Sequence, residues 1–436
     1  MFRRILATTV LLLVAQRIGA QRIVIGITGS SRAQPGLVVL AGRGLDSART
    51  IVQRDLQNSD RYTVSPLVDS AGSLRAPLDS VALSGIAGPG LSWVVELQAS
   101  GNAVSVKLWD AATGAMRYQA ISIVDLSGAG DTRITIHRIS DQVVNWTGGI
   151  GIAATRIAFK MKNGTDDAIW RVDADGANLA RVSRTRYYTQ TPAWHPDGSA
   201  IAFSEYRDGY WHLVLQKLLS GTRTELTGVG AGTAGNAFGG TFSPDGKTMV
   251  VTYQAQTGGT LIESVDVARN CCAFELTHDR RNADNLSATY QPNGRHIAYI
   301  STRSGTPQIY VMDADGSNSE QQVPPGFDDR GRFLDTYSPA WSPDGTKIAF
   351  TRDLNGGGRQ VFRWSIGGGS PTQVTSTGRN EDATWAPDSR HLVFKSWRSG
   401  REQLWIIDIE SGVQRQIGTP GGAQAPAWSP VLGTNP

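Results

Sequence analysis

Trp341-Ser342-Pro343-Asp344-Gly345 is the clearest copy of a five-residue phrase that recurs through the second half of the chain. Similar phrases begin at five other aromatic residues, the last of them shortened to Trp428-Ser429-Pro430. These six anchors lie 48, 48, 51, 44 and 43 residues apart and are Trp194, Phe242, Tyr290, Trp341, Trp385 and Trp428. A repeat of roughly 40 to 50 residues is typical of a β-propeller blade built from four short strands.

Each phrase predicts a tight turn between two antiparallel strands. Proline presets φ, aspartate bonds to nearby amides, and glycine adopts the backbone conformation that side chains avoid. A short alternating apolar strand follows each turn, for example Ile348-Ala349-Phe350. Because an aromatic side chain buries about 150–250 Å², we expect each anchor to fill the space between neighbouring blades.

The two ends of the repeat region predict how the ring closes. No second, third or fourth strand follows Trp428, whereas strands without a leading anchor stand at Arg156–Phe159, Ala168–Val172 and Ala180–Val182. We therefore expect the C-terminal strand to complete the blade that begins near residue 155, which gives six blades over residues 151–436. Closure of the ring removes exposed sheet edges.

The first 150 residues follow a different pattern. Residues 1–20 join Arg3 and Arg4 to an apolar run and are predicted to be a cleaved secretory signal, too short to span a membrane. Residues 21–150 are expected to form a small domain with a partly antiparallel sheet. Its expected strands are 23–25, 37–40, 62–64, 93–97, 104–108 and 118–124, and its expected helices are 46–58, 77–83 and a segment around 136–146. The predicted fold class is thus an α+β N-terminal domain followed by an all-β six-bladed β-propeller.

Charge and cysteine content narrow the possible functions. The net charge is +4, but without residues 1–20 it falls to +1, with 39 basic and 38 acidic residues. No basic block remains, so we expect no nucleic-acid binding. Cys271 and Cys272 are adjacent in an expected strand, where neighbouring side chains point to opposite faces, which favours two thiols over a strained vicinal disulfide.

This order of a signal peptide, a small α/β domain and a propeller of Pro-Asp-Gly repeats resembles the TolB family, the periplasmic component of the Tol–Pal system. The resemblance covers nearly the whole chain after residue 20. The stretches that carry it, besides the repeats, are Arg22-Ile23-Val24-Ile25, Arg54–Ser59, Arg156–Phe159 and Pro426–Pro430.

The resemblance implies a non-enzymatic adaptor in the periplasm, a monomer with no cofactor, no metal and no membrane insertion. Such a protein binds the lipoprotein Pal through one mouth of the propeller and the membrane protein TolA through its N-terminal tail. It supports outer-membrane integrity and invagination during cell division. By position the tail is residues 21–27, with Arg22, Ile23, Val24 and Ile25 as its contact residues. The same residues could instead form an ordinary edge strand of the domain.

The surface that faces Pal should consist of the loops that lead into the anchors, because these loops run to one end of the ring. Loops on a rigid scaffold commonly carry binding residues. The candidates are Thr189, Gln190, Asn236, Gly239, Asn285, Leu286, Asp335, Tyr337, Glu381, Asp382 and Gln424.

Other functional interpretations have weaker support. Gly230, Gly232 and Gly235 match a dinucleotide motif but lack the flanking strand and helix, and the aspartate-rich stretches at 173–176 and 313–316 lack the later ligands of a calcium loop. The six histidines show no zinc-ligand spacing, and no Gly-x-Ser-x-Gly motif supports a hydrolase. A propeller that binds a saccharide or a cell-wall fragment near Glu381 and Asp382 stays open as the alternative function.

Overall fold

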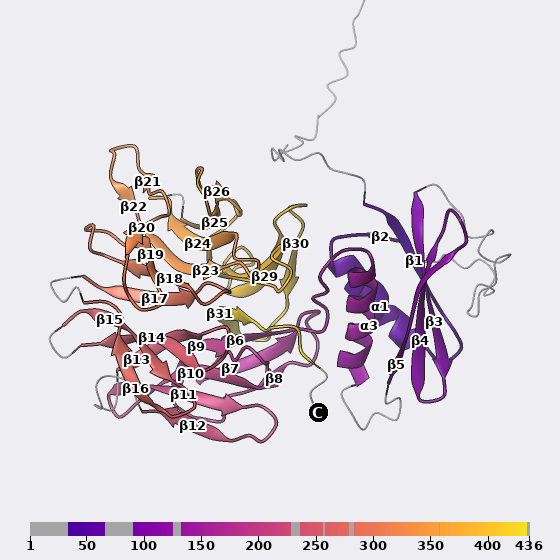
Figure 1. The fold of residues 1–436 in the computed structure, drawn as a ribbon, viewed down its shortest axis with the longest axis horizontal. Coiled ribbons are helices and arrows are strands. Elements are labelled where there is room, and N and C mark those ends of the chain that lie inside the picture. The colour runs from indigo at the N-terminus through magenta and orange to yellow at the C-terminus, as the bar shows by residue number, and fades with distance from the viewer. Residues whose placement is uncertain are drawn as a thin grey trace, which may run out of the picture. The chain divides into compact units, whose positions relative to one another are not determined.

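The computed structural model describes residues 34–65, 90–124, 132–227, 236–255, 258–278, 283–356 and 358–433 (Figure 1). The predicted signal at 1–20, the tail residues 22–25, the helix expected at 77–83 and residues 228–235 of one loop lie outside this part of the chain. In the described residues, neither α-helix has the length and hydropathy needed to cross a bilayer.

In the described residues the N-terminal domain is a mixed five-stranded sheet with two helices, which agrees with the predicted α+β fold class. Its first strand pairs in parallel with two neighbours, and the last three strands form an antiparallel meander. The sheet order is β2 (Thr63–Val64), β1 (Gly36–Ala41), β3 (Leu91–Ser100), β4 (Ala103–Asp110) and β5 (Met116–Ile123). The helices are α1 (Asp46–Asn58) and α3 (Thr132–Trp146), whose buried faces share one apolar core with the sheet.

The propeller has six four-stranded antiparallel sheets, which confirms the predicted fold class. We number the blades in chain order and give the shared blade last. Blade one has β9 (Tyr188–Trp194), β10 (Ala200–Arg207), β11 (Tyr210–Lys217) and β12 (Arg223–Leu226), and blade two has β13 (Ala237–Phe242), β14 (Thr248–Gln254), β15 (Thr260–Asp266) and β16 (Cys271–Glu275). Blade three has β17 (Asn285–Tyr290), β18 (His296–Ser301), β19 (Gln308–Asp313) and β20 (Glu320–Gln321), and blade four has β23 (Thr336–Trp341), β24 (Lys347–Asp353), β25 (Arg359–Ser365) and β26 (Thr372–Gln373). Blade five has β27 (Asn380–Trp385), β28 (His391–Ser396), β29 (Gln403–Asp408) and β30 (Gln414–Ile417).

Blade six is assembled from both ends of the repeat region. Its order is β31 (Gly422–Trp428), β6 (Arg156–Asn163), β7 (Asp166–Asp173) and β8 (Ala180–Arg181). The C-terminal strand pairs antiparallel with β6, with Trp428 opposite Ile157 and Gly422 opposite Lys162. The last strand therefore supplies the innermost strand of a blade whose other three strands precede the first anchor, as the sequence predicted.

The anchors lie between blades. Trp341, which is 8% exposed, packs with residues of blade three and of its own blade four. The indole N–H of Trp194 donates to the carbonyl of Ala427 in blade six, and that of Trp385 donates to the carbonyl of Ala340 in blade four, both at 3.0 Å. These side chains join each blade to the one before it.

Two features of the chain differ from expectation or were not foreseen. The prediction of two free thiols is wrong, because Cys271 and Cys272 form a disulfide. The pairing of β15 with β16 shifts register here and Cys272 has a φ of 65°, so the regular alternation of side chains that the prediction assumed does not hold. In addition, a small hairpin of β21 (Gly326–Phe327) and β22 (Phe333–Leu334) interrupts the connection from blade three to blade four.

Candidate functional site

One mouth of the propeller collects the starts of all six innermost strands. The first strand of each blade contacts the first strands of both neighbours around the ring, in the order β9, β13, β17, β23, β27, β31 and back to β9. Because these strands run in the same sense, their starts lie at one mouth and the Pro-Asp-Gly turns at the other. The turns between the second and third strands of each blade lie at the same mouth as the starts of the innermost strands, since the second strand runs antiparallel to the first. We call this face the rim.

A β-bulge with left-handed backbone recurs three residues before every anchor. The pairing of the first two strands shifts register there in all six blades. The bulged residues have φ between 46° and 64° and are Thr191, Gly239, Ser287, Ser338, Asp382 and Ala425. Bulges bend a strand and redirect its side chains. Since five of the six are not glycine, the rim maintains a backbone conformation that side chains disfavour.

Bulge amides also connect neighbouring blades. The N–H of Gly239 donates to the hydroxyl of Ser204 at 2.8 Å, and the N–H of Asp382 donates to the hydroxyl of Thr351 at 3.2 Å. Both hydroxyls belong to the second strand of the preceding blade. The rim is thus a connected part of the ring and not a set of independent loops.

The bulge conformation gives a direct stability prediction. Replacing Gly239 (φ +64°) by valine should lower the free energy of unfolding by about 1–3 kcal/mol through backbone strain. A Cβ at this position would meet no atom within 4 Å, so no steric clash contributes. Gly418→Val is the matched control, because Gly418 also has open space but no positive φ. Urea denaturation of both variants checks this, and equal effects at the two positions would contradict the role of φ.

The structure places the eleven predicted partner-contact residues at the starts of the innermost strands, but not all of them reach the surface. Thr189, Asn285 and Glu381 are buried. The partly exposed ones are Gln190, Asn236, Gly239, Leu286, Asp335, Tyr337, Asp382 and Gln424. The partly exposed residues can therefore contact a partner directly, while the three buried residues support the rim from the interior.

Glu381 and Asp382 belong to a charge network that is balanced within the protein. Lys395 Nζ lies 2.8 Å from Glu381 Oε2 and 3.2 Å from Asp382 Oδ2. Arg379 and Arg359 also lie against the Glu381 carboxylate. Burial by itself raises the pKa of Glu381, but Lys395 and Arg379 outweigh it and lower that pKa below its ordinary value. The carboxylate is therefore charged and already neutralised by its neighbours.

A small cavity lies beside this network. Its volume is about 170 Å³, and Glu381, Asp382 and Tyr337 are among the residues that line it. Burial and the hydrogen bond that the Tyr337 hydroxyl donates to Asp335 raise the pKa of Tyr337 to about 12. The phenol is thus a neutral hydrogen-bond donor at neutral pH.

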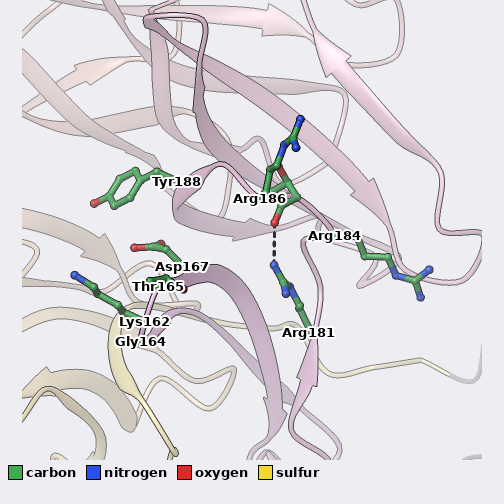
Figure 2. A pocket seen from close by; sticks show the side chains of 9 residues that line it. Lys162, Gly164, Thr165, Asp167, Arg181, Arg184, Arg186 and Tyr188 are labelled. Atoms are coloured by element: carbon green, nitrogen blue, oxygen red, sulfur yellow. Dashed lines mark hydrogen bonds between the residues drawn. The ribbon is translucent and has the colours of Figure 1, made fainter.

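A much larger cavity opens where blade six meets blade one (Figure 2). Its volume is about 990 Å³, and its nine lining residues are Lys162, Gly164, Thr165, Asp167, Arg181, Arg184, Thr185, Arg186 and Tyr188. They come from the β6–β7 turn with the adjoining strand ends, from the end of β8 and from the segment that leads into the start of β9, so the cavity lies on the rim. We call it the basic pocket. The pocket could not be recognised in the sequence, because its four cations are spread over two segments and form no basic block.

Exposed aromatic side chains adjoin the basic pocket. Tyr206 is the cross-strand neighbour of both Tyr188 and Trp211. The Trp211 ring centroid lies 5.2 Å from that of Tyr206, 5.7 Å from that of Tyr188 and 6.4 Å from that of Phe238. Tyr188 and Tyr206 are each 44% exposed. We call these four residues the aromatic cluster.

Two buried histidine–carboxylate groups join the N-terminal domain to the propeller. Their members are Asp55, His137 and Asp175, and Asp60, His391 and Asp408. Each group has the ligand types for a metal ion, but Arg133 lies against Asp175 and Arg390 lies against Asp408. The protein itself thus supplies the positive charge at both places. Sequence spacing could not indicate these groups, because their members come from distant segments.

The second group predicts a pH dependence of stability. Burial alone lowers the pKa of His391, but hydrogen bonds to Asp388 and Asp60 outweigh it and raise that pKa above its ordinary value. The folded state therefore binds this proton more tightly than the unfolded state. The resulting stabilisation is complete below about pH 6.5, the ordinary histidine value, and is lost as pH rises through the folded pKa.

In the wild type we expect the free energy of unfolding to decrease between near-neutral and mildly alkaline pH. In His391→Gln this decrease should be smaller, and the part that remains should come from His137. Guanidinium denaturation across this range measures the effect. His278, whose side chain is 73% exposed, provides the control variant His278→Gln, which should keep the wild-type profile. Identical profiles for His391→Gln and the wild type would refute the assignment.

Known proteins share this fold and sequence pattern. A family model described as the TolB beta propeller domain matches residues 144–432. The chain is 25% identical over 316 residues to the "Tol-Pal system protein TolB" of Francisella tularensis subsp. mediasiatica (strain FSC147), covering 68% of this chain and 69% of that protein. It is also 25% identical to the protein of the same name from Francisella tularensis subsp. tularensis (strain FSC 198), covering 68% of each. The crystal structure of TolB from Acinetobacter baumannii shares the fold, with a TM-score of 0.76 at 24% identity over 92% of this chain and 97% of that chain. The family match spans every blade, and the chain therefore belongs to the TolB β-propeller family.

Proposed function

We propose that this chain is a non-enzymatic adaptor of the Tol–Pal system in the periplasm, where it supports outer-membrane integrity and invagination during cell division. The observation that carries the proposal is the TolB family match over residues 144–432, which includes all six innermost strands and the rim. The names of the Francisella relatives, which place those proteins in the Tol-Pal system, support the same assignment.

In this proposal the rim binds Pal, and the N-terminal tail with Arg22, Ile23, Val24 and Ile25 binds TolA. An extended apolar tail can add a strand to a partner sheet. The proposed boundaries are a signal at 1–20, the N-terminal domain at 21–150 and the propeller at 151–436. The saccharide alternative gains no support from the cavity at Glu381 and Asp382, because about 170 Å³ lies below the roughly 300–1,000 Å³ of ordinary small-molecule sites.

Rim variants test Pal binding. Gln190 and Gln424 lie on adjacent innermost strands and are partly exposed, so Gln190→Arg with Gln424→Arg should obstruct the rim without removing a buried side chain. We expect Pal of the same organism to bind this variant at least about tenfold more weakly, a loss of about 1.4 kcal/mol. Glu381 is unsuitable for this purpose, because a bulky residue there would disrupt its ion pairs.

The control carries the same substitutions on outer strands. Thr372→Arg with Gln416→Arg changes exposed positions of β26 and β30 and should leave Pal affinity unchanged. Deletion of residues 21–27 should abolish capture of TolA and preserve capture of Pal. If the rim variant folds and binds Pal with wild-type affinity, the rim is not the Pal site.

A further inference from the structure

We propose that the sector of the rim formed by the basic pocket and the aromatic cluster binds an extended acidic peptide segment of a protein partner. This goes beyond the proposed function, because it assigns a ligand chemistry to one sector whichever protein docks on the rim.

Most of the charged side chains that line the basic pocket are cations. Lys162, Arg181, Arg184 and Arg186 line it, and Asp167 is its one acidic lining residue. Asp167 is neutralised from outside the lining set, because the buried Lys160 places Nζ 3.3 Å from Asp167 Oδ2. Among the side chains that the structure describes, no carboxylate forms an ion pair with Lys162, Arg184 or Arg186. The pocket therefore presents positive charge that a ligand must balance.

A different sector of the rim, in blades four and five, has a balanced arrangement of charges. There Lys395, Arg359 and Arg379 all lie against Glu381, and Lys395 also pairs with Asp382. Basic and acidic side chains thus compensate one another around Glu381, whereas cations predominate in the basic pocket.

The cationic side chains of the basic pocket point in different directions. Figure 2 shows Lys162, Arg184 and Arg186 pointing to different sides of the pocket instead of toward one centre. Arg181 is held in place by the hydrogen bonds it donates to the carbonyls of Ser183 and Thr185, at 2.7 and 2.8 Å. A single phosphate is best bound by converging donors, whereas separated cations suit several anionic groups spaced along a chain.

The aromatic cluster beside the pocket adds an apolar contact surface. Tyrosine, tryptophan and arginine are the side chains enriched at protein–protein interfaces, where they dominate the binding energy. Tyr188 belongs to both the pocket and the cluster, so charge and aromatic surface are continuous. A segment that alternates acidic and apolar side chains matches this surface. The concave shape of the pocket fits a single peptide chain better than the broad surface of a bilayer.

Fluorescence anisotropy with the full chain tests the proposal. The probe is a fluorescein-labelled peptide that alternates glutamate with phenylalanine and glycine, and its partner probe carries glutamine at every glutamate. We expect the wild type to bind the glutamate peptide, to lose affinity as salt is added, and to bind the glutamine peptide at least about tenfold more weakly, because the glutamine peptide forms no ion pairs.

Charge reversal locates the site. Arg184→Glu with Arg186→Glu should reduce affinity for the glutamate peptide at least about tenfold. Both positions are exposed, so the fold should tolerate the change, and circular dichroism verifies folding. Lys247→Glu with Arg269→Glu makes the same change in net charge at exposed positions outside the pocket and should retain wild-type affinity.

Three results would overturn the proposal. The wild type could fail to bind the glutamate peptide, the pocket and control variants could lose equal affinity for it, or the pocket variant could lose none. Inorganic phosphate that binds the pocket as tightly as the peptide would show a single-anion site instead. Binding to vesicles of anionic phospholipid through Arg184 and Arg186, without peptide binding, would indicate a membrane contact. None of these measurements contains Pal, so their failure is distinguishable from failure of the proposed function.

Discussion

Trp341→Ala is expected to lower the free energy of unfolding by about 3–5 kcal/mol, the usual cost of removing a large buried aromatic side chain. Trp341 is 8% exposed and packs against Ile300, Ile309 and Val311 of blade three. It also packs against Phe350 and Phe362 of its own blade. Its loss would leave a cavity between two blades that neither backbone can close, because both sheets are held by the ring.

Chemical denaturation of Trp341→Ala measures this effect. Phe274 offers a matched control, since it is an aromatic residue on the outer strand β16 and is 55% exposed, so Phe274→Ala should cost less than about 1 kcal/mol. A similarly small cost for Trp341→Ala would show that the anchor does not stabilise the contact between blades three and four.

Removal of residues 422–436 is expected to abolish cooperative folding of the propeller. This deletion takes away β31, the innermost strand of blade six, together with Trp428. The Trp428 indole N–H donates to the hydroxyl of Thr155 at 2.8 Å, and the side chain packs with blades five and six. The deletion would expose the edge of β6 and open the ring. The free energy of unfolding of a folded domain is only about 5–15 kcal/mol, so losing the Trp428 side chain and one strand should remove a large fraction of it.

Gel filtration and thermal unfolding by circular dichroism distinguish the outcomes. The control deletion removes residues 434–436, which follow the β31 contacts, and should melt like the wild type. A chain without residues 422–436 that stays monomeric and keeps the wild-type melting temperature would contradict closure by the C-terminal strand.

Most of the fold could be predicted from the repeated phrase in the sequence. The regular spacing of the aromatic anchors indicates a repeated unit that stacks on its neighbours. Ring closure could be predicted because the strands that do not follow Trp428 are present at 156–182 instead. Helix 46–58 was also predictable, because Ala48, Val52 and Leu56 recur at helical spacing and are buried in the structure.

The site was only partly predictable. Strand starts could be located from the anchors, but whether Thr189 or Glu381 points inward depends on the bulge three residues before each anchor. The bulged positions hold residues as different as threonine, glycine and aspartate, so they left no recognisable pattern. The basic pocket and the aromatic cluster were missed for a related reason. Their members are ordinary surface residues in sequence and become a continuous surface only when blade six closes against blade one.

Amide hydrogen exchange of the chain with and without Pal tests the central claim most directly. That claim is that a closed propeller presents one face, the rim, to its partner. Pal should slow exchange at the starts of the innermost strands and at the turns between second and third strands, and should leave the Pro-Asp-Gly turns at the opposite mouth unchanged. Protection at the Pro-Asp-Gly turns with none on the rim, or no protection anywhere at saturating Pal, would contradict it.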